Sequence, residues 1–173
     1  MADELTAANQ MENAKASQGY WLVKFAPFRT AWMEIVKRGT FTLRGVRSPA
    51  ARKHLAGMRR GDPVLFYHSQ RELAVVGVME VTREAYRDPT SADPRWLTCD
   101  FVPVRTLARP VPLEAIKADA RLATLPLVRQ PRLAVMQVTE AEFRIIIENA
   151  STSEGSQTSE VRGVRRRSLD ISE

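Results

Sequence analysis

The stretch Gly61-Asp62-Pro63-Val64-Leu65-Phe66-Tyr67-His68-Ser69 says most about the fold of this chain. A Gly-Asp-Pro turn signal precedes its apolar run, and the run ends on aromatic, titratable and hydroxyl side chains. The turn residues Gln70-Arg71-Glu72 follow, and a second apolar run extends from Leu73 to Val81. Two apolar runs joined by a short polar turn predict a β-hairpin. The polar end of its first strand could stack on a flat heterocycle and hydrogen-bond to it.

The three residues at this strand end cannot all point the same way. On a regular strand Tyr67 and Ser69 share one face and His68 lies on the other. Tyr67 and Ser69 could line a pocket. His68 could contact a ligand or be a buried residue satisfied by a backbone carbonyl, because a neutral imidazole donates one hydrogen bond and accepts one.

The composition fits one domain. The chain has 173 residues, of which 44% are hydrophobic, enough to bury a core. It has no run of about 18 apolar residues and no signal-peptide pattern, so we expect no membrane span and a cytoplasmic location, or a nuclear one in a eukaryote. The single cysteine, Cys99, has no disulfide partner and no zinc-ligand spacing, and we expect it in the core.

The two ends of the chain differ from its middle. Residues 1–19 and 151–173 are polar and charged, and they are predicted to be flexible tails around a domain at 20–150. The ends carry net charges of −2 and 0, so the total of +6 leaves +8 on the domain. A basic domain favours an anionic partner such as nucleic acid.

The residues before the hairpin predict one strand and two helices. The strand spans residues 20–25, and Pro27 is expected to begin a helix with Phe28, Trp32, Ile35 and Val36 on its apolar stripe, ended by Gly39. Ser48 and Pro49 are a helix start, with the serine as N-cap and the proline in the first turn.

The residues after the hairpin alternate again between strand and helix patterns. A strand is expected over 96–107, with Pro103 marking an edge or a bulge, and another over 132–138. Short helices are expected over 112–118 and 120–125, and Thr139 and Glu142 are at capping-box spacing before a final helix. This order predicts an α+β fold, a small mixed barrel with helices packed around it.

Short matches to one known family follow one another in order along about residues 20–147: Tyr20-Trp21-Leu22-Val23-Lys24, Gly45-Val46-Arg47, Met58, Gly61-Asp62, Phe66-Tyr67-His68-Ser69, Val76-Gly77-Val78, Glu84-Ala85-Tyr86, Asp88-Pro89-Thr90 and Leu127-Val128-Arg129-Gln130-Pro131-Arg132-Leu133. Through these matches the chain resembles the EVE domain family. EVE domains are members of the PUA-like superfamily, a distorted β-barrel related to YTH and ASCH domains.

The resemblance implies a non-catalytic domain that binds DNA or RNA carrying a modified base in a pocket at the barrel mouth, with no cofactor. The ligand-binding residues that it implies come from several elements: Lys24, Phe25, Trp32, Arg47, Ser48, Tyr67, His68, Ser69 and Arg132. A basic surface is expected to hold phosphates through Arg44, Arg52, Lys53, Arg59 and Arg60.

Three departures from the family pattern alter the implied pocket. Phe25-Ala26-Pro27 replaces Ser-Glu-Pro after the first-strand lysine, and Leu43-Arg44-Gly45-Val46-Arg47-Ser48 replaces Trp-Asp-Gly-Val-Arg-Asn. Near the end, Arg132-Leu133-Ala134-Val135 replaces Arg-Leu-Ser-Val. Together they make the pocket more apolar and more basic, which changes the few polar groups that could read a base edge.

Several of these residues also have purely structural explanations. Trp32 falls on an apolar stripe, so core packing explains it without a ligand. Arg47 lies before a capped helix start, where an anion could bind, or it could pair with a local acid. Phosphate contact is favoured for the arginine-rich stretch because no acid follows until Asp62, whereas Arg132 could instead pair with Asp88 or Asp100.

The alternative function is a hydrolase or nuclease acting on RNA or a nucleotide. Adjacent strand residues diverge, so His68 and Ser69 do not form a nucleophile and base pair. The two histidines and one cysteine provide no metal-ligand motif, and no glycine-rich phosphate loop is present. A nuclease using Tyr67 and Lys24 stays open. The expectation is a domain without catalytic residues, cofactor or metal, whose oligomeric state the sequence leaves open.

Overall fold

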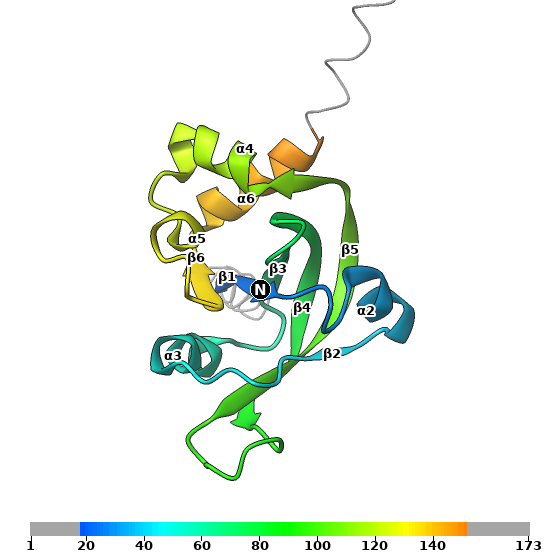
Figure 1. The fold of residues 1–173 in the computed structure, drawn as a ribbon, viewed down its shortest axis with the longest axis vertical. Helices are drawn as coiled ribbons and strands as arrows, with labels where there is room; N and C mark the ends of the chain where they lie inside the picture. The colour runs from blue at the N-terminus through cyan, green and yellow to red at the C-terminus, as the bar shows by residue number, and fades with distance from the viewer. Residues whose placement is uncertain (1–17, 152–173) are drawn as a thin grey trace, which may run out of the picture.

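The structure, a computed structural model, describes residues 18–151 and contains one mixed sheet with helices around it (Figure 1). The six strands are β1 (Tyr20–Phe25), β2 (Phe41–Thr42), β3 (Pro63–His68), β4 (Ala74–Arg87), β5 (Leu97–Pro112) and β6 (Val135–Val138). The helices are α2 (Trp32–Arg38), α3 (Pro49–Gly57), α4 (Leu113–Ala118), the 3₁₀ helix η1 (Ala120–Leu122), α5 (Pro126–Arg129) and α6 (Glu140–Ser151). The expected α+β class is confirmed.

The strand order is β2-β5-β4-β3-β1-β6. The hairpin predicted from the opening stretch is the antiparallel β3–β4 pair, which is confirmed. Strands β1 and β3 are the parallel pair, with Trp21 opposite Val64 and Phe25 opposite His68. Because parallel strands end at the same edge of a sheet, the polar end of β3 and the end of β1 lie side by side. This edge positions the candidate site.

The core centres on aromatic rings beside this edge. Phe66 is fully buried, and its ring centroid lies 5.5 Å from that of Trp32 and 5.6 Å from that of Phe41. Phe25 packs against Phe41 with centroids 5.2 Å apart, in an edge-to-face arrangement favoured by the ring quadrupoles. The aromatic cluster therefore connects β1, β2, β3 and α2. Cys99 is fully buried, as expected, and burial, with the nearby Asp100 and Glu84 carboxylates, raises the pKa of its thiol to about 12.

The first helix begins later than its sequence pattern predicts. Residues 27–29 form a turn and α2 starts at Trp32, so the expected start at Pro27 is wrong, and Phe28 is 71% exposed instead of lying in the core. The N-cap, Ala31, offers no side-chain acceptor, and the Trp32 amide instead donates to His68 Nε2 at 3.1 Å. A residue from β3 thus sets the helix start. Gly39 ends α2 in the left-handed conformation, as expected.

Other local signals are confirmed. Ser48 caps α3 by accepting from the Ala51 amide, and Thr139 and Glu142 exchange reciprocal capping bonds at the start of α6. The pairing of β4 with β5 shifts register between Val78 and Met79, opposite the segment from Pro103 to Arg105, which confirms the bulge predicted there.

Two expectations near the C-terminal half are corrected. The strand expected from Arg132 begins only at Val135, because residues 131 and 132 form a turn after α5. The helix expected over 120–125 is the short η1, and α5 follows it.

The predicted tails lie outside the described residues except at their inner ends. At the inner end of the N-terminal tail, the Gly19 amide donates a hydrogen bond to Asp62 Oδ1 at 3.1 Å. Among residues 18–151, no helix is both long enough and apolar enough to cross a bilayer.

Candidate nucleic-acid interface

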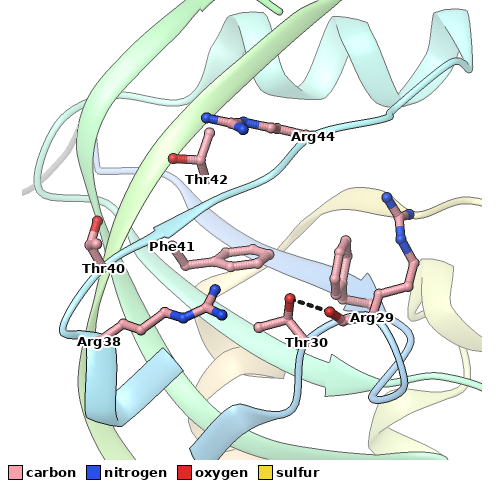
Figure 2. A pocket seen from close by; sticks show the side chains of 8 residues that line it. Arg29, Thr30, Arg38, Thr40, Phe41, Thr42 and Arg44 are labelled. Carbon is pink, nitrogen blue, oxygen red and sulfur yellow. Dashed lines mark hydrogen bonds between the residues drawn. The ribbon is translucent and has the colours of Figure 1, made fainter. Parts of the chain in front are cut away.

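Two hollows lie beside the end of β1. The first, of about 360 Å³, is shown in Figure 2 and is lined by Phe25, Arg29, Thr30, Arg38, Thr40, Phe41, Thr42 and Arg44. The second, of about 400 Å³, is lined by Ser48, Gln130, Pro131, Arg132 and Leu133. Residues 43–48 connect them, because Arg44 lines one hollow and Ser48 the other.

The first hollow is cationic and aromatic. The Arg29 guanidinium lies 4.8 Å from the centroid of the Phe25 ring, and Arg38 pairs with Glu34 one turn earlier on α2. Among residues 18–151, no carboxylate lines this hollow. Of the site residues predicted from the sequence, the structure brings Phe25 and Arg44 together here.

The second hollow gathers Ser48 and Arg132, which the sequence also predicted, and Lys24 reaches its border. The Lys24 ammonium donates to the Pro131 carbonyl oxygen and lies 6.0 Å from the centroid of the Tyr67 ring. Burial lowers the pKa of Lys24 below the ordinary lysine value. Arg132 is exposed and forms no salt bridge within residues 18–151. The pairing with Asp88 or Asp100 considered from the sequence is therefore absent there.

Arg47 is engaged by a buried acid. Asp88 Oδ2 accepts hydrogen bonds from Arg47 Nη1 at 2.8 Å and from the Gly45 amide at 3.2 Å, and its other oxygen accepts from Thr90. Burial alone raises the pKa of Asp88, but these hydrogen bonds outweigh it and hold the pKa well below its usual range. Of the two explanations for Arg47, the structure therefore shows the paired one, and this pairing fixes the segment between the two hollows.

The arginine-rich stretch formed by α3 and the residues after it is less free than its sequence suggests. Arg52 and Lys53 lie on α3, whereas Arg59 and Arg60 lie beyond its last residue, Gly57. Arg59 Nη1 lies 3.6 Å from Glu84 of β4, and the Arg60 amide donates to the same carboxylate. The Arg52 guanidinium carbon lies 5.8 Å from the centroid of the Trp96 ring, and the Lys53 side chain is exposed. The sequence has no acid between Arg44 and Asp62, but the fold brings two distant acids beside this stretch: Glu84 on β4, and Asp88, which directly follows β4.

The aromatic and polar end of β3 is buried. Tyr67 is 1% exposed, His68 4% and Trp32 3%. The extra residue at the β3–β4 register shift, Val76, lies on β4, and β3 stays in regular register with β1 through His68. Tyr67 and His68 therefore keep the alternation expected of a strand, and both are covered. Burial raises the pKa of Tyr67 to about 12. None of the three lines either hollow, so their contact with a ligand stays a prediction that requires the edge to open.

His68 has two protein partners in this arrangement. Its Nε2 accepts from the Trp32 amide, and its Nδ1 faces the carboxylate of Glu72. Trp32 in turn donates from its indole N–H to Thr106 Oγ1 at 2.9 Å. The Ser69 amide donates to the Phe25 carbonyl oxygen at 2.9 Å, and so ties the end of β3 to the end of β1.

The sequence reasoning missed several residues of the first hollow. Arg29 and Arg38 follow from no motif, since they lie at a turn and at a helix end. A signal was present in residues 40–44, where Thr40, Thr42 and Arg44 alternate with the buried Phe41 and Leu43. This two-residue period places polar groups on one side of a strand. Within residues 18–151, no group of three or more His, Cys, Asp or Glu side chains could hold a metal ion.

Comparison with known proteins places this chain in a family. A family model for the EVE domain matches residues 19–149. Thymocyte nuclear protein 1 of Mus musculus is 29% identical over 167 residues, an alignment that covers 77% of this chain and 74% of that protein.

Solved structures agree with the family model. The NMR structure of a Rhodopseudomonas palustris protein is 38% identical, with a TM-score of 0.73 and coverage of 77% of this chain and 93% of that one. Human THYN1, solved in complex with 5-methylcytosine containing DNA, is 25% identical, with a TM-score of 0.70 and coverage of 77% and 98%. The PUA-like fold expected from the resemblance is shared with these structures. The chain belongs to the EVE domain family.

Proposed function

We propose that this chain is a non-catalytic nucleic-acid-binding domain that recognises a modified base at the edge where β1 and β3 end, and that its basic surface holds the phosphate backbone. The observation that carries this proposal is the relation to human THYN1, which was solved in complex with 5-methylcytosine containing DNA. Because the alignment covers 98% of that chain, the relation involves its whole solved domain and not a shared fragment.

The second hollow is the proposed place for the base. Its volume of about 400 Å³ falls in the range of about 300–1,000 Å³ that is usual for small-ligand pockets. Ser48, Gln130 and Arg132 supply a hydroxyl, an amide and a guanidinium, which can pair with the edge of a base. Tyr67, near Lys24 at its border, offers an aromatic face if the edge opens on binding.

The charge of the domain supports contact with the backbone. The net charge of the central region is +8, and in the part of the chain that the structure describes neither hollow is lined by a carboxylate. Phosphate contacts of this kind make affinity fall as salt rises, because each contact releases condensed counterions.

Binding of matched oligonucleotides tests the proposal. A panel carrying cytosine or 5-methylcytosine at one position is titrated by fluorescence anisotropy at two salt concentrations. We expect tighter binding to the modified member and a steep loss of affinity for both at the higher salt. Arg132→Gln is expected to reduce the preference, whereas Lys117→Gln, which removes an equal charge from α4, is expected to leave it unchanged. Equal affinity across the panel would contradict base recognition, and absence of binding would contradict the function.

A further inference from the structure

The first hollow brings together three guanidinium groups from separate parts of the chain. Arg29 follows β1, Arg38 lies at the end of α2, and Arg44 follows β2. In the view of Figure 2, Arg44 and Arg38 lie on opposite sides of the Phe41 ring, and Arg29 lies across the hollow from Thr40 and Thr42. The fold therefore surrounds one space with three positive charges.

These charges are only partly neutralised by the protein. Arg29 and Arg44 form no salt bridge within residues 18–151, and Arg38 pairs with Glu34, whose side chain is itself 44% exposed. Like charges around one hollow repel one another when nothing lies between them. An anion in the hollow would relieve this repulsion.

The arginine donors are available to such an anion. The Arg29 guanidinium carbon lies 4.8 Å from the centroid of the Phe25 ring, and its side chain makes no hydrogen bond or ion pair within residues 18–151, so its N–H groups can donate to a ligand. The threonine hydroxyls are already used as donors: Thr42 Oγ1 donates to Asp100 at 2.8 Å and Thr30 Oγ1 to the Arg29 carbonyl oxygen at 2.6 Å. Recognition of an anion here falls to the guanidinium groups.

Gly45 allows Arg29 to reach the connecting segment. A Cβ built on Gly45 would lie 3.3 Å from Arg29 Nη2, and its φ of +84° is a conformation that other residues rarely adopt. Asp88 holds the same segment through the Gly45 amide and Arg47. The backbone that follows Arg44 is therefore held by a buried carboxylate before any ligand binds.

We propose that this hollow binds a phosphate group, held by Arg29, Arg38 and Arg44, with the rings of Phe25 and Phe41 beside the sugar or base attached to it. Arginine matches phosphate with planar, charge-assisted N–H donors. That the phosphate belongs to a bound nucleic acid rests on the proposed function. The hollow would then hold the backbone while the second hollow takes the base, on the two sides of residues 43–48.

The salt dependence of oligonucleotide binding tests the site. Arg29→Gln, Arg44→Gln and the double variant are compared with wild type and with Lys117→Gln, after circular dichroism confirms that each is folded. Each single variant is expected to weaken binding about tenfold and to reduce the slope of log K against log salt by about 1. The double variant is expected to reduce this slope by little more than either single variant does, because both arginines contact one phosphate. The proposal would be overturned if the slopes are unchanged, or if the reduction in the double variant equals the sum of the two single reductions.

Calorimetric titration with deoxycytidine 5′-monophosphate and inorganic phosphate separates this site from the proposed function. Binding by wild type and its loss in the double variant support the hollow, even if no oligonucleotide binds, in which case the phosphate source is a free nucleotide and the proposed function fails. Normal oligonucleotide binding by the double variant, with no nucleotide or phosphate bound by wild type, would overturn the hollow and leave the proposed function standing.

Discussion

The indole of Trp32 lies directly on the backbone of Gly77. A Cβ built on Gly77 would come within 2.2 Å of Trp32 Cζ2 and 2.3 Å of Cε2, closer than real side chains ever approach. Helix α2 is thereby held against β4, and the Trp32 indole N–H reaches Thr106 on β5. The glycine that the sequence shows inside a strand thus serves a close approach of one element to another.

Gly77→Ala is expected to destabilise the domain by about 3 kcal/mol, because the rigid indole must move and lose its bond to Thr106. The free energy of unfolding in urea measures this cost. In a Trp32→Phe background the smaller ring leaves more space, so the same substitution is expected to cost less. An equal cost in both backgrounds would show that the clash is not with Trp32.

His68 satisfies the first backbone amide of α2. Its Nε2 accepts from the Trp32 amide, one of the first-turn amides that have no partner within the helix. His68→Ala is expected to lower the free energy of unfolding by about 2 kcal/mol by leaving this amide unpaired. Glu72→Gln, which alters only the exposed partner of the ring, is the matched control and is expected to cost less. If His68→Ala leaves stability unchanged, the bond has no energetic role.

Asp88 gives the stability of the domain a defined pH dependence. Its pKa in the folded chain lies below the ordinary value of 3.8, so its contribution is fully present above about pH 4 and is lost as the pH falls through the folded pKa. Asp88→Asn lacks this contribution and is expected to be less stable than wild type by about 3 kcal/mol at pH 7. Urea unfolding at pH 7 and pH 2 is expected to show the difference between the two proteins narrowing on acidification. A constant difference would contradict the ionised, hydrogen-bonded carboxylate.

Tyr67→Phe tests the role of the hydroxyl of this buried residue independently of its ring. Truncation to alanine would leave a cavity costing about 3–5 kcal/mol and would confuse binding with unfolding. The phenylalanine variant keeps the ring, so its stability is expected to change by less than about 1 kcal/mol. If Tyr67 hydrogen-bonds to the base, Tyr67→Phe lowers the preference for the modified oligonucleotide and leaves the affinity for the unmodified oligonucleotide unchanged. An unchanged preference would limit Tyr67 to a ring contact or to the core.

Local signals explain what the sequence could predict. The hairpin, the Ser48 cap, the Gly39 helix end and the Thr139–Glu142 capping box each depend on residues a few positions apart. Contacts between distant segments explain what it could not. The pairing of Arg47 with Asp88 joins residues 41 positions apart, and the start of α2 depends on His68, 36 positions away.

The candidate site divides in the same way. Family resemblance drew attention to Lys24, Ser48 and Arg132, which the fold brings to the border of one hollow. The cationic hollow depends on how α2 turns back to β2, a tertiary arrangement that places Arg29 and Arg38 beside Arg44. No short motif contains these three residues, so only the fold reveals them together.

Nucleic acid is expected to bind where β1 and β3 end, and backbone amide chemical shifts of the labelled chain, recorded on addition of a 5-methylcytosine oligonucleotide, locate the contact. We predict the largest shifts at residues 24–30, 43–48 and 130–133, and smaller ones there with the unmodified oligonucleotide. Shifts confined to the groove at the opposite end of β1, around Tyr20 and Glu140, would contradict it.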